Sequence, residues 1–262
     1  MRVTELGQAI GAEWTKLWSV RSTWWCLAGA TALMAVSALT LGGATAMDPL
    51  RGGIRFPASE PVVSATSFAQ FALVALAMLA VTSEYASGGI RATLQATPVR
   101  GRMLAAKALV VGPVMAVAGV ASGGVATAVV FLALSAEVFG GRVVLPPAQV
   151  ALDLLRVGVF FALVSVMTLG VGTAIRSAAG TLTVVFMLLM GVPLMLLTTG
   201  GEAALAVSLR MPLFAGLAFM GSTDNLTGGP IPYSAGEGLA WLLAWTAAAL
   251  AAGHAVLRRR DA

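Results

Sequence analysis

The sequence has few charged residues, one histidine and one cysteine. Only 10% of its 262 residues are charged, against about 25% in ordinary soluble domains. The single cysteine, Cys26, excludes an internal disulfide. The single histidine, His254, cannot form a metal site that needs several histidines. These shortages argue against a soluble domain, a disulfide-stabilised fold and a histidine-ligated metalloenzyme.

The common catalytic motifs are missing as well. The chain contains no G-x-S-x-G, H-E-x-x-H or G-x-x-x-x-G-K-[ST] pattern, so it lacks a nucleophile elbow, a zinc-protease helix and a P-loop. The middles of its apolar runs carry almost no ionisable residues. Ion-coupled transport would need buried carboxylates there, so the sequence argues against it. Its net charge of +5 is dispersed rather than clustered among aromatics, which argues against nucleic acid as a partner. We expect a protein that is not an enzyme and holds no cofactor of its own.

Hydrophobic residues make up 58% of the chain, and its mean hydropathy is +0.91. Several runs reach the roughly 20 apolar residues that a helix needs to cross a bilayer. We therefore predict an all-α integral membrane protein with a single transmembrane domain over residues 1–262, in which 24–257 hold six spans and 258–262 form a basic tail. The predicted spans are 24–47, 62–83, 104–135, 150–175, 178–199 and 238–257.

The distribution of lysine and arginine predicts the orientation. With both termini on the cytoplasmic side, the inner segments hold eleven of the sixteen basic residues, including Lys16, Lys107 and the cluster at 258–260. Cytoplasmic loops carry such an excess of positive charge. The prediction is a multi-pass protein of a bacterial plasma membrane with both ends in the cytoplasm.

Residues 1–23 are predicted to form an interfacial helix. Five apolar side chains recur there at helical spacing, whereas the charged residues lie off that stripe. A helix of this kind lies at the headgroup level with its tryptophans at the interface. The stripe consists of Leu6, Ile10, Trp14, Leu17 and Trp18.

Residues 200–237 contain apolar pieces that are too short and too interrupted for a seventh span. A seventh crossing would also place the basic cluster at 258–260 outside, against the charge bias. We expect an outer-leaflet hairpin that breaks near Arg210-Met211-Pro212 and leads into a Gly/Pro loop before the sixth span.

A charged stretch, EYASGGIRATLQATPVRGRMLAAK, interrupts the apolar sequence at 84–107. Ser87 is a candidate N-cap, Ile90 to Ala96 can form about two helical turns, and Pro98 would end them. Ile90 and Leu94 share one face with Arg91 beside them, which suits docking into a groove of a partner. Arg100, Arg102 and Lys107 are expected at the anionic lipid surface. An ordinary positively charged loop is the alternative.

Two segments resemble a known family. The stretch AEWTKLWSVRSTWW before the first span and TSEYASGGIRATLQATPVRGRMLAAKAL after the second are similar to the permease subunits of ABC type-2 exporters, and the resemblance extends over the whole chain. It implies that the loop between spans two and three is a coupling helix for a separate ATPase dimer, which would bind ATP and Mg. It also implies a second permease subunit, expected as a homodimer. The residues that match the family pattern are Glu84, Gly88, Arg91, Pro98, Arg100 and Lys107.

The resemblance implies export of a hydrophobic or amphipathic substrate such as a drug, an antibiotic or a lipid. Flexible apolar side chains suit an adaptable cavity for such a compound, but packing in the core or against lipid is the default explanation for them. The candidates are Phe186, Met187, Met190 and Met195. Two other classes remain: an immunity or signalling subunit that binds an ATPase without transport, and an intramembrane enzyme.

Overall fold

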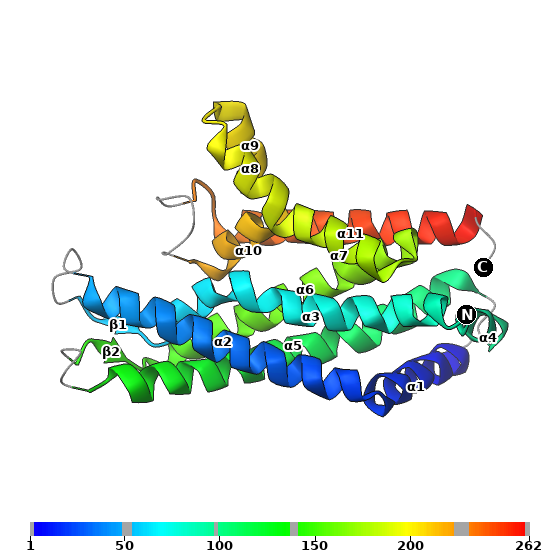
Figure 1. The fold of residues 1–262 in the computed structure, drawn as a ribbon, viewed down its shortest axis with the longest axis horizontal. Coiled ribbons are helices and arrows are strands. Elements are labelled where there is room, and N and C mark those ends of the chain that lie inside the picture. The colour runs from blue at the N-terminus through cyan, green and yellow to red at the C-terminus, as the bar shows by residue number, and fades with distance from the viewer. Residues whose placement is uncertain (1–2, 49–53, 97–98, 137–140, 223–230, 260–262) are drawn as a thin grey trace.

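The computed structural model describes residues 3–259 except 49–53, 97–98, 137–140 and 223–230. The described residues form an elongated helical bundle (Figure 1), and six of its helical segments are long and apolar enough to cross a membrane. The chain is thus a multi-pass membrane protein, and the six predicted spans are confirmed with ends that differ by a few residues. They are α2 (Arg21–Met47), α3 (Glu60–Ala86), α5 (Arg100–Leu134), α6 (Pro147–Ile175), the run from α7 to α8, and α11 (Ala235–Arg259).

The fifth span is divided into three pieces. It consists of α7 (Ala178–Phe186), a π-helical turn η3 (Met187–Gly191) and α8 (Val192–Thr198). A sharp turn separates it from α6, because Arg176 adopts a left-handed backbone with φ of 63° and Ser177 then caps α7 by accepting a hydrogen bond from the Gly180 amide. This π-helical turn was not predicted from the sequence.

The bundle core is made by α2, α3, α5 and α6, and α11 packs along α6. Glycines allow the closest approaches. A side chain at Gly170 would place its Cβ 2.5 Å from the backbone of Ala249 in α11, and one at Gly158 would lie 2.8 Å from the Ala116 carbonyl oxygen in α5. Small residues bring membrane helices together in this way, and here they do so within one chain.

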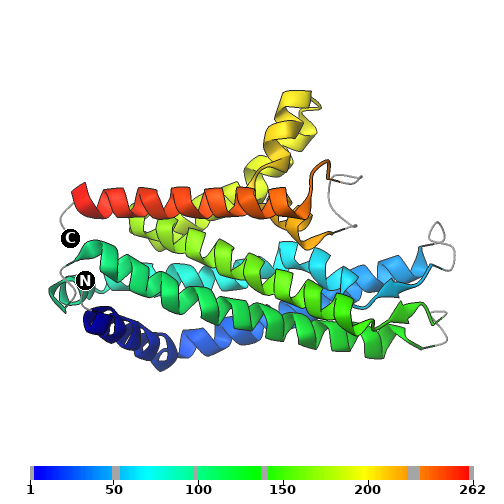
Figure 2. The same cartoon turned by 180° about the vertical axis from the view of Figure 1, so that it is seen from behind.

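Both chain ends lie at one end of the bundle, together with α1 (Val3–Ser19) and α4 (Ile90–Ala96) (Figures 1 and 2). We call this the termini end. At the opposite end, two-residue strands β1 (Phe56–Pro57) and β2 (Val143–Val144) pair in parallel, which the sequence did not predict. Close to them, the carboxylate of Asp153 accepts hydrogen bonds from Ser59 at 2.6 Å and Gln149 at 2.8 Å.

The predicted hairpin consists of α9 (Glu202–Leu209) and α10 (Pro212–Met220), which are bent by 66°. The break falls at Arg210 and Met211, as predicted. Two aromatic side chains satisfy backbone carbonyls there: Trp245 donates to the Arg210 oxygen at 2.9 Å, and the Tyr233 hydroxyl donates to the Leu209 oxygen. Helices α8 and α9 stand out from the bundle (Figure 1), so we call the segment from α7 to α9 the arm.

Candidate functional site

A cluster of charged side chains joins four helices at the termini end. Glu13 and Lys16 come from α1, Glu84 from α3, Thr93 from α4 and Lys107 from α5. We call these five residues the charged junction. Each of the four charges lies opposite a charge of the other sign from another helix, so the cluster connects α1, α3 and α5 electrostatically and reaches α4 through a hydrogen bond.

Lys107 is the buried centre of the charged junction. Its side chain is 2% exposed, and its ammonium group donates to Glu13 Oε2 at 2.7 Å and to Glu84 Oε1 at 2.8 Å. The third proton is directed to the backbone oxygen of Ala80 at 3.2 Å. Burial of a charge is unfavourable unless it is paired and hydrogen-bonded, and here all three donors of the ammonium group have acceptors.

Lys16 connects the charged junction to α4. Its ammonium group donates to Glu13 Oε1 and to Glu84 Oε1, each at 2.9 Å, and to the Thr93 hydroxyl at 3.1 Å. Burial by itself would lower the pKa of Lys16, but the hydrogen bonds and charges of Glu13 and Glu84 outweigh it and raise that pKa. Lys16 therefore stays protonated well above neutral pH and keeps α1 attached to α4.

The turn from α3 into α4 uses the predicted glycine pair. Gly88 has a left-handed φ of +74°, which a glycine adopts without steric cost. Ser87 was predicted to cap α4, and this prediction is wrong. Ser87 instead ends α3, where its backbone amide and its hydroxyl both donate to the Ser83 oxygen. The helix Ile90–Ala96 has the predicted length.

Ile90 faces the interior of the protein. It is 5% exposed and forms a small apolar cluster with Met103 and Leu104 of α5 and Leu257 of α11. The prediction that Ile90 forms part of a docking face is therefore wrong, because its buried side chain attaches α4 to the bundle. Arg91 and Gln95 of α4 are exposed. The Leu94 side chain and Pro98 lie outside the described residues.

The three basic residues predicted at the lipid surface form contacts within the protein. Lys107 belongs to the charged junction, the Arg100 guanidinium donates to the Leu257 carbonyl of α11, and Arg102 forms an ion pair with Glu5 of α1. Intramolecular acceptors were available because α1 folds back along α5, a contact that the linear sequence does not reveal.

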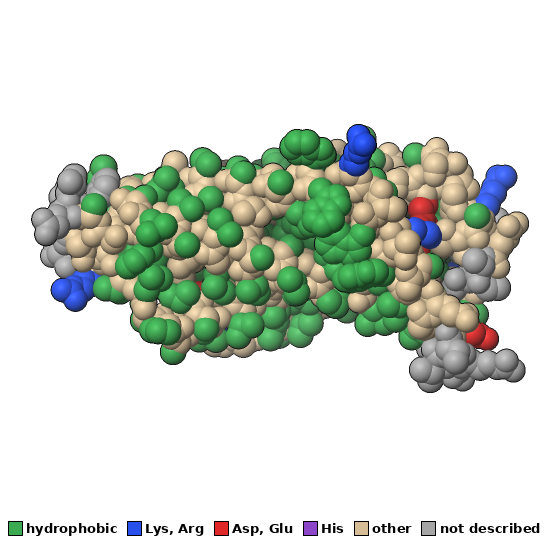
Figure 3. All heavy atoms as spheres, turned by 90° about the horizontal axis from the view of Figure 1, so that it is seen from below, with side chains coloured by type: hydrophobic (Ala, Val, Ile, Leu, Met, Phe, Trp, Pro, Cys, Tyr) green, Lys and Arg blue, Asp and Glu red, His purple; other side chains and the backbone are tan. Residues whose placement is uncertain are grey.

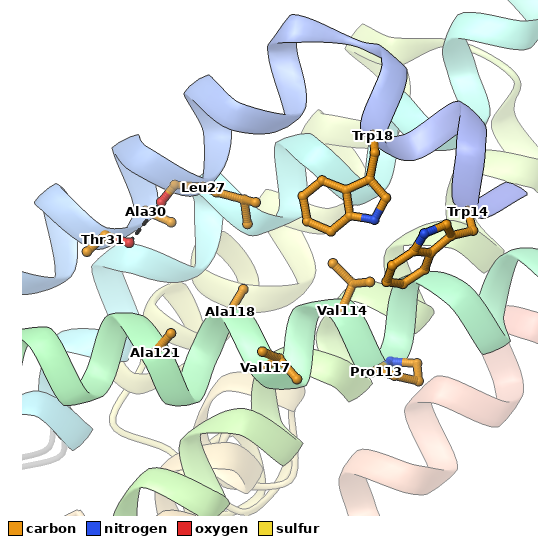
Figure 4. Close-up of a pocket in the computed structure, with 10 residues that line it drawn as sticks. All are labelled: Trp14, Trp18, Leu27, Ala30, Thr31, Pro113, Val114, Val117, Ala118 and Ala121. Atoms are coloured by element: carbon orange, nitrogen blue, oxygen red, sulfur yellow. Dashed lines mark hydrogen bonds between the residues drawn. The ribbon is translucent and has the colours of Figure 1, made fainter.

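The apolar stripe of α1 is divided between the protein and its surface. Leu17 is buried at 7% exposure, whereas Trp14 is 51% exposed; Leu6, Ile10 and Trp18 are half-buried. The Trp14 and Trp18 rings lie 5.6 Å apart and border an apolar groove of about 400 Å³ between α2 and α5, which Val114 and Val117 also line (Figure 4). One face of the bundle is hydrophobic over much of its length (Figure 3).

The four cavity candidates lie in the arm. Phe186, Met187 and Met195 are exposed and Met190 is half-buried. Phe186 contacts Phe71 of α3, with ring centroids 5.3 Å apart. These residues line neither the apolar groove nor the cavity at the charged junction. Their exposure on a membrane-spanning segment fits contact with lipid or with another protein surface.

A cavity of about 440 Å³ adjoins the charged junction, between the α1–α2 turn, α3, α4 and α5. We call it the junction cavity. Its charged wall holds Glu13, Lys16, Glu84 and Lys107, and its apolar wall is lined by residues such as Leu76, Leu79, Val110 and Val111. Among the described residues, no three side chains that could ligate a metal come together.

Glu13, Lys16 and Thr93 are the residues of this site that were not predicted from the sequence. Glu13 and Lys16 appeared only as the polar side of an interfacial helix. Their partners Glu84 and Lys107 lie beside them on α3 and α5. Opposite charges at the ends of neighbouring apolar runs were a usable signal for this pairing, because ionisable residues are rare in so apolar a chain. Neither the protein-family models nor the curated proteins with which the sequence was compared match it.

Proposed function

We propose that this chain is the membrane-spanning permease subunit of an ATP-driven exporter, and that α4 receives the movement of a separate ATPase. The observation that carries the proposal is the attachment of α4. This short helix joins two spans at the termini end, exposes Arg91 and Gln95, and is linked by Thr93 to the charges that hold α1, α3 and α5 together.

The charged junction would transmit a push on α4 to several helices at once. Removing Lys107 from either glutamate would leave a buried charge without its partner, which typically costs about 3–5 kcal/mol. Movements that keep the cluster intact are therefore favoured over movements that divide it. In this proposal α1, α3 and α5 shift together, and the spans alternate between inward and outward openings.

The proposal places the termini end in the cytoplasm of a bacterium, consistent with the basic residues gathered there. ATP and Mg would bind to the partner ATPase, since the sequence has no P-loop of its own. A second permease subunit would complete the path, and the substrate would be hydrophobic or amphipathic. The arm, whose apolar side chains are exposed, is one surface on which such a subunit would fit.

Charge reversal on α4 tests this function. The chain should be co-expressed with an ATPase whose gene neighbours its own and which carries a P-loop. We expect Arg91→Glu to weaken binding of that ATPase by about tenfold or more, as co-purification measures it, because it reverses an exposed charge on the proposed contact helix. A tenfold loss corresponds to about 1.4 kcal/mol. ATP-dependent uptake of hydrophobic fluorescent compounds into inverted vesicles should fall with it.

Arg55→Glu is the matched control, because Arg55 is an exposed arginine at the opposite end of the bundle. It should alter neither measurement. Equal effects of the two substitutions, or none from Arg91→Glu, would contradict the proposed role of α4. Intact co-purification without any uptake would instead favour a subunit that binds an ATPase for immunity or signalling.

A further inference from the structure

One buried carboxylate oxygen of the charged junction has no hydrogen-bond donor among the described residues. The two lysine ammonium groups supply six protons, and all six are donated within the described residues. Both oxygens of Glu13 and the Oε1 atom of Glu84 accept four of these protons, and the Thr93 hydroxyl and the Ala80 carbonyl accept the other two. Glu84 Oε2 is buried and has no partner among the described residues.

An unpaired carboxylate oxygen in a buried place requires a donor. Leaving part of a buried charged group without a hydrogen bond is unfavourable, and the neighbouring lysines have no proton left to give. The cluster is also balanced in charge, with two carboxylates and two ammonium groups. The group that completes it is therefore a hydrogen-bond donor, and an anion would find no free donor on these two lysines.

The junction cavity provides room for such a group beside Glu84. The torsion that orients a glutamate carboxylate is broad, so Oε2 can turn to meet a donor that enters the cavity. Its volume of about 440 Å³ lies within the range of about 300–1,000 Å³ that is usual for small-molecule sites. Water alone would fill the polar part but would leave the apolar wall wet.

The cavity is polar at one end and apolar at the other. Leu76 precedes Glu84 by eight residues on α3, about 12 Å along the helix axis, and Val110 and Val111 follow Lys107 by about one turn on α5. The apolar wall therefore extends from the charged junction toward the middle of the bundle. A ligand that fits both ends has a donor head and a hydrophobic body.

We infer that the junction cavity binds an amphiphile with a primary ammonium head, which donates to Glu84 Oε2 while its hydrophobic body packs on Leu76, Leu79 and Val111. A hydroxyl would also form a charge-assisted hydrogen bond with the carboxylate, but an ammonium head adds Coulomb attraction to Glu84. The positive charge that it brings to the balanced cluster is screened by the solvent that reaches Lys16, whose side chain is 45% exposed. The identification of this ligand as a transported substrate rests on the proposed export function. The binding itself does not.

The probe for the test is dansylcadaverine, a fluorescent apolar ring with a primary amine on an alkyl chain. The full chain is placed in nanodiscs of neutral lipid without any ATPase, and energy transfer from tryptophan to the dansyl group is measured. Trp14 and Trp18 lie on α1, which also borders the cavity. We expect saturable binding that exceeds partition into empty nanodiscs. The dansyl amide of a plain alkylamine, which lacks the ammonium group, should bind about tenfold more weakly.

Two glutamate variants isolate the unpaired oxygen. Glu84→Gln replaces a carboxylate oxygen with an amide donor, whereas Glu5→Gln removes the same charge at the termini end from a residue that pairs with Arg102 and does not line the cavity. We expect Glu84→Gln to weaken binding of dansylcadaverine by about tenfold or more and Glu5→Gln by less than about threefold. Circular dichroism and thermal unfolding of both variants identify any loss of folding.

A second pair of variants tests the location without touching the charges. Ala92 is exposed on α4 and lines the cavity, whereas Ala86 is exposed at the end of α3 outside the set of residues that line it. Ala92→Phe should block binding and Ala86→Phe should not. Equal affinities of the two probes, equal effects of the two glutamate variants, or full binding by Ala92→Phe would each overturn the inference and leave water as the partner of Oε2. A chain that fails these binding tests but still purifies with its ATPase would leave the export proposal standing.

Discussion

Helix α3 and the run from α7 to α8 are similarly apolar, yet they occupy opposite environments. In the most apolar part of α3, 72% of the residues are buried inside the protein, against 22% in the run from α7 to α8. The side chains differ in kind. Helix α3 buries Ser64, Thr66, Ser67 and Gln70, whereas the arm exposes large apolar residues such as Leu182, Phe186 and Met195.

The difference shows that hydropathy measures compatibility with lipid and not burial in protein. Lipid tails are as apolar as leucine, so membrane helices gain little by hiding large hydrophobic side chains from lipid. Small and weakly polar residues let backbones approach closely instead. Two of the polar groups in α3 bond to their own helix: Thr66 donates to the Val63 oxygen at 2.6 Å, and Gln70 to the Ser67 oxygen at 2.9 Å. The Ser64 hydroxyl instead shares a hydrogen bond of 3.0 Å with the Ser222 hydroxyl.

The largest expected effect comes from the charge that the bundle buries. We expect Lys107→Met to lower the free energy of unfolding by about 3–5 kcal/mol, because it leaves Glu13 and Glu84 facing each other with one lysine fewer. Unfolding of the purified chain by SDS in mixed micelles measures the change.

Lys16→Met is the control for charge. It removes one positive charge from the same cluster, but the Lys16 side chain is 45% exposed, so solvent screens its pairs. Its effect should be clearly smaller than that of Lys107→Met. Equal losses would mean that burial of Lys107 adds nothing to the strength of the cluster.

A pair of phenylalanines tests the comparison with apolar side chains. Phe160 on α6 is fully buried, whereas Phe186 on the arm is 43% exposed. Phe160→Ala should cost about 3–5 kcal/mol, because it leaves a cavity in the core. Phe186→Ala should cost less than about 1 kcal/mol, as exposed substitutions do. The same SDS unfolding measures both, and a larger loss at Phe186 would show that a protein surface covers the arm.

The smallest effect concerns the attachment of the arm. Burial, with a contribution from the charge of Glu237, raises the pKa of Tyr233 to about 12, above the ordinary value of about 10. The folded state therefore holds the proton more tightly than the unfolded state. The stability from this hydroxyl is fully present below about pH 10 and is lost as the pH rises toward about 12.

Tyrosinate absorbance measures this titration, and the spectrum of Tyr233→Phe is subtracted to remove Tyr85, the other tyrosine of the chain. We expect the difference to show one step near pH 12 and the variant to unfold at high pH with a shallower dependence. A step near pH 10 would show that Tyr233 is not buried when the chain is in the membrane.

Prediction from sequence succeeded where a property depends on composition along the chain. The six spans, the break at Arg210 and the short helix at 90–96 follow from runs, prolines and glycines that act locally. It failed where a partner lies far away in sequence. Lys107 was assigned to lipid headgroups, and Ile90 to a partner protein, because Glu13 and Leu257 are distant along the chain.

The sequence by itself determined that this chain has six helices long and apolar enough to cross a membrane, since each apolar run must satisfy its own backbone hydrogen bonds as a helix. Only the tertiary structure decided which apolar helix is buried, and which oxygen of Glu84 remains without a donor. The physical reason is that helix formation in lipid is a local requirement, whereas burial and charge pairing depend on which helices pack side by side. Small residues permit that packing without specifying the neighbour.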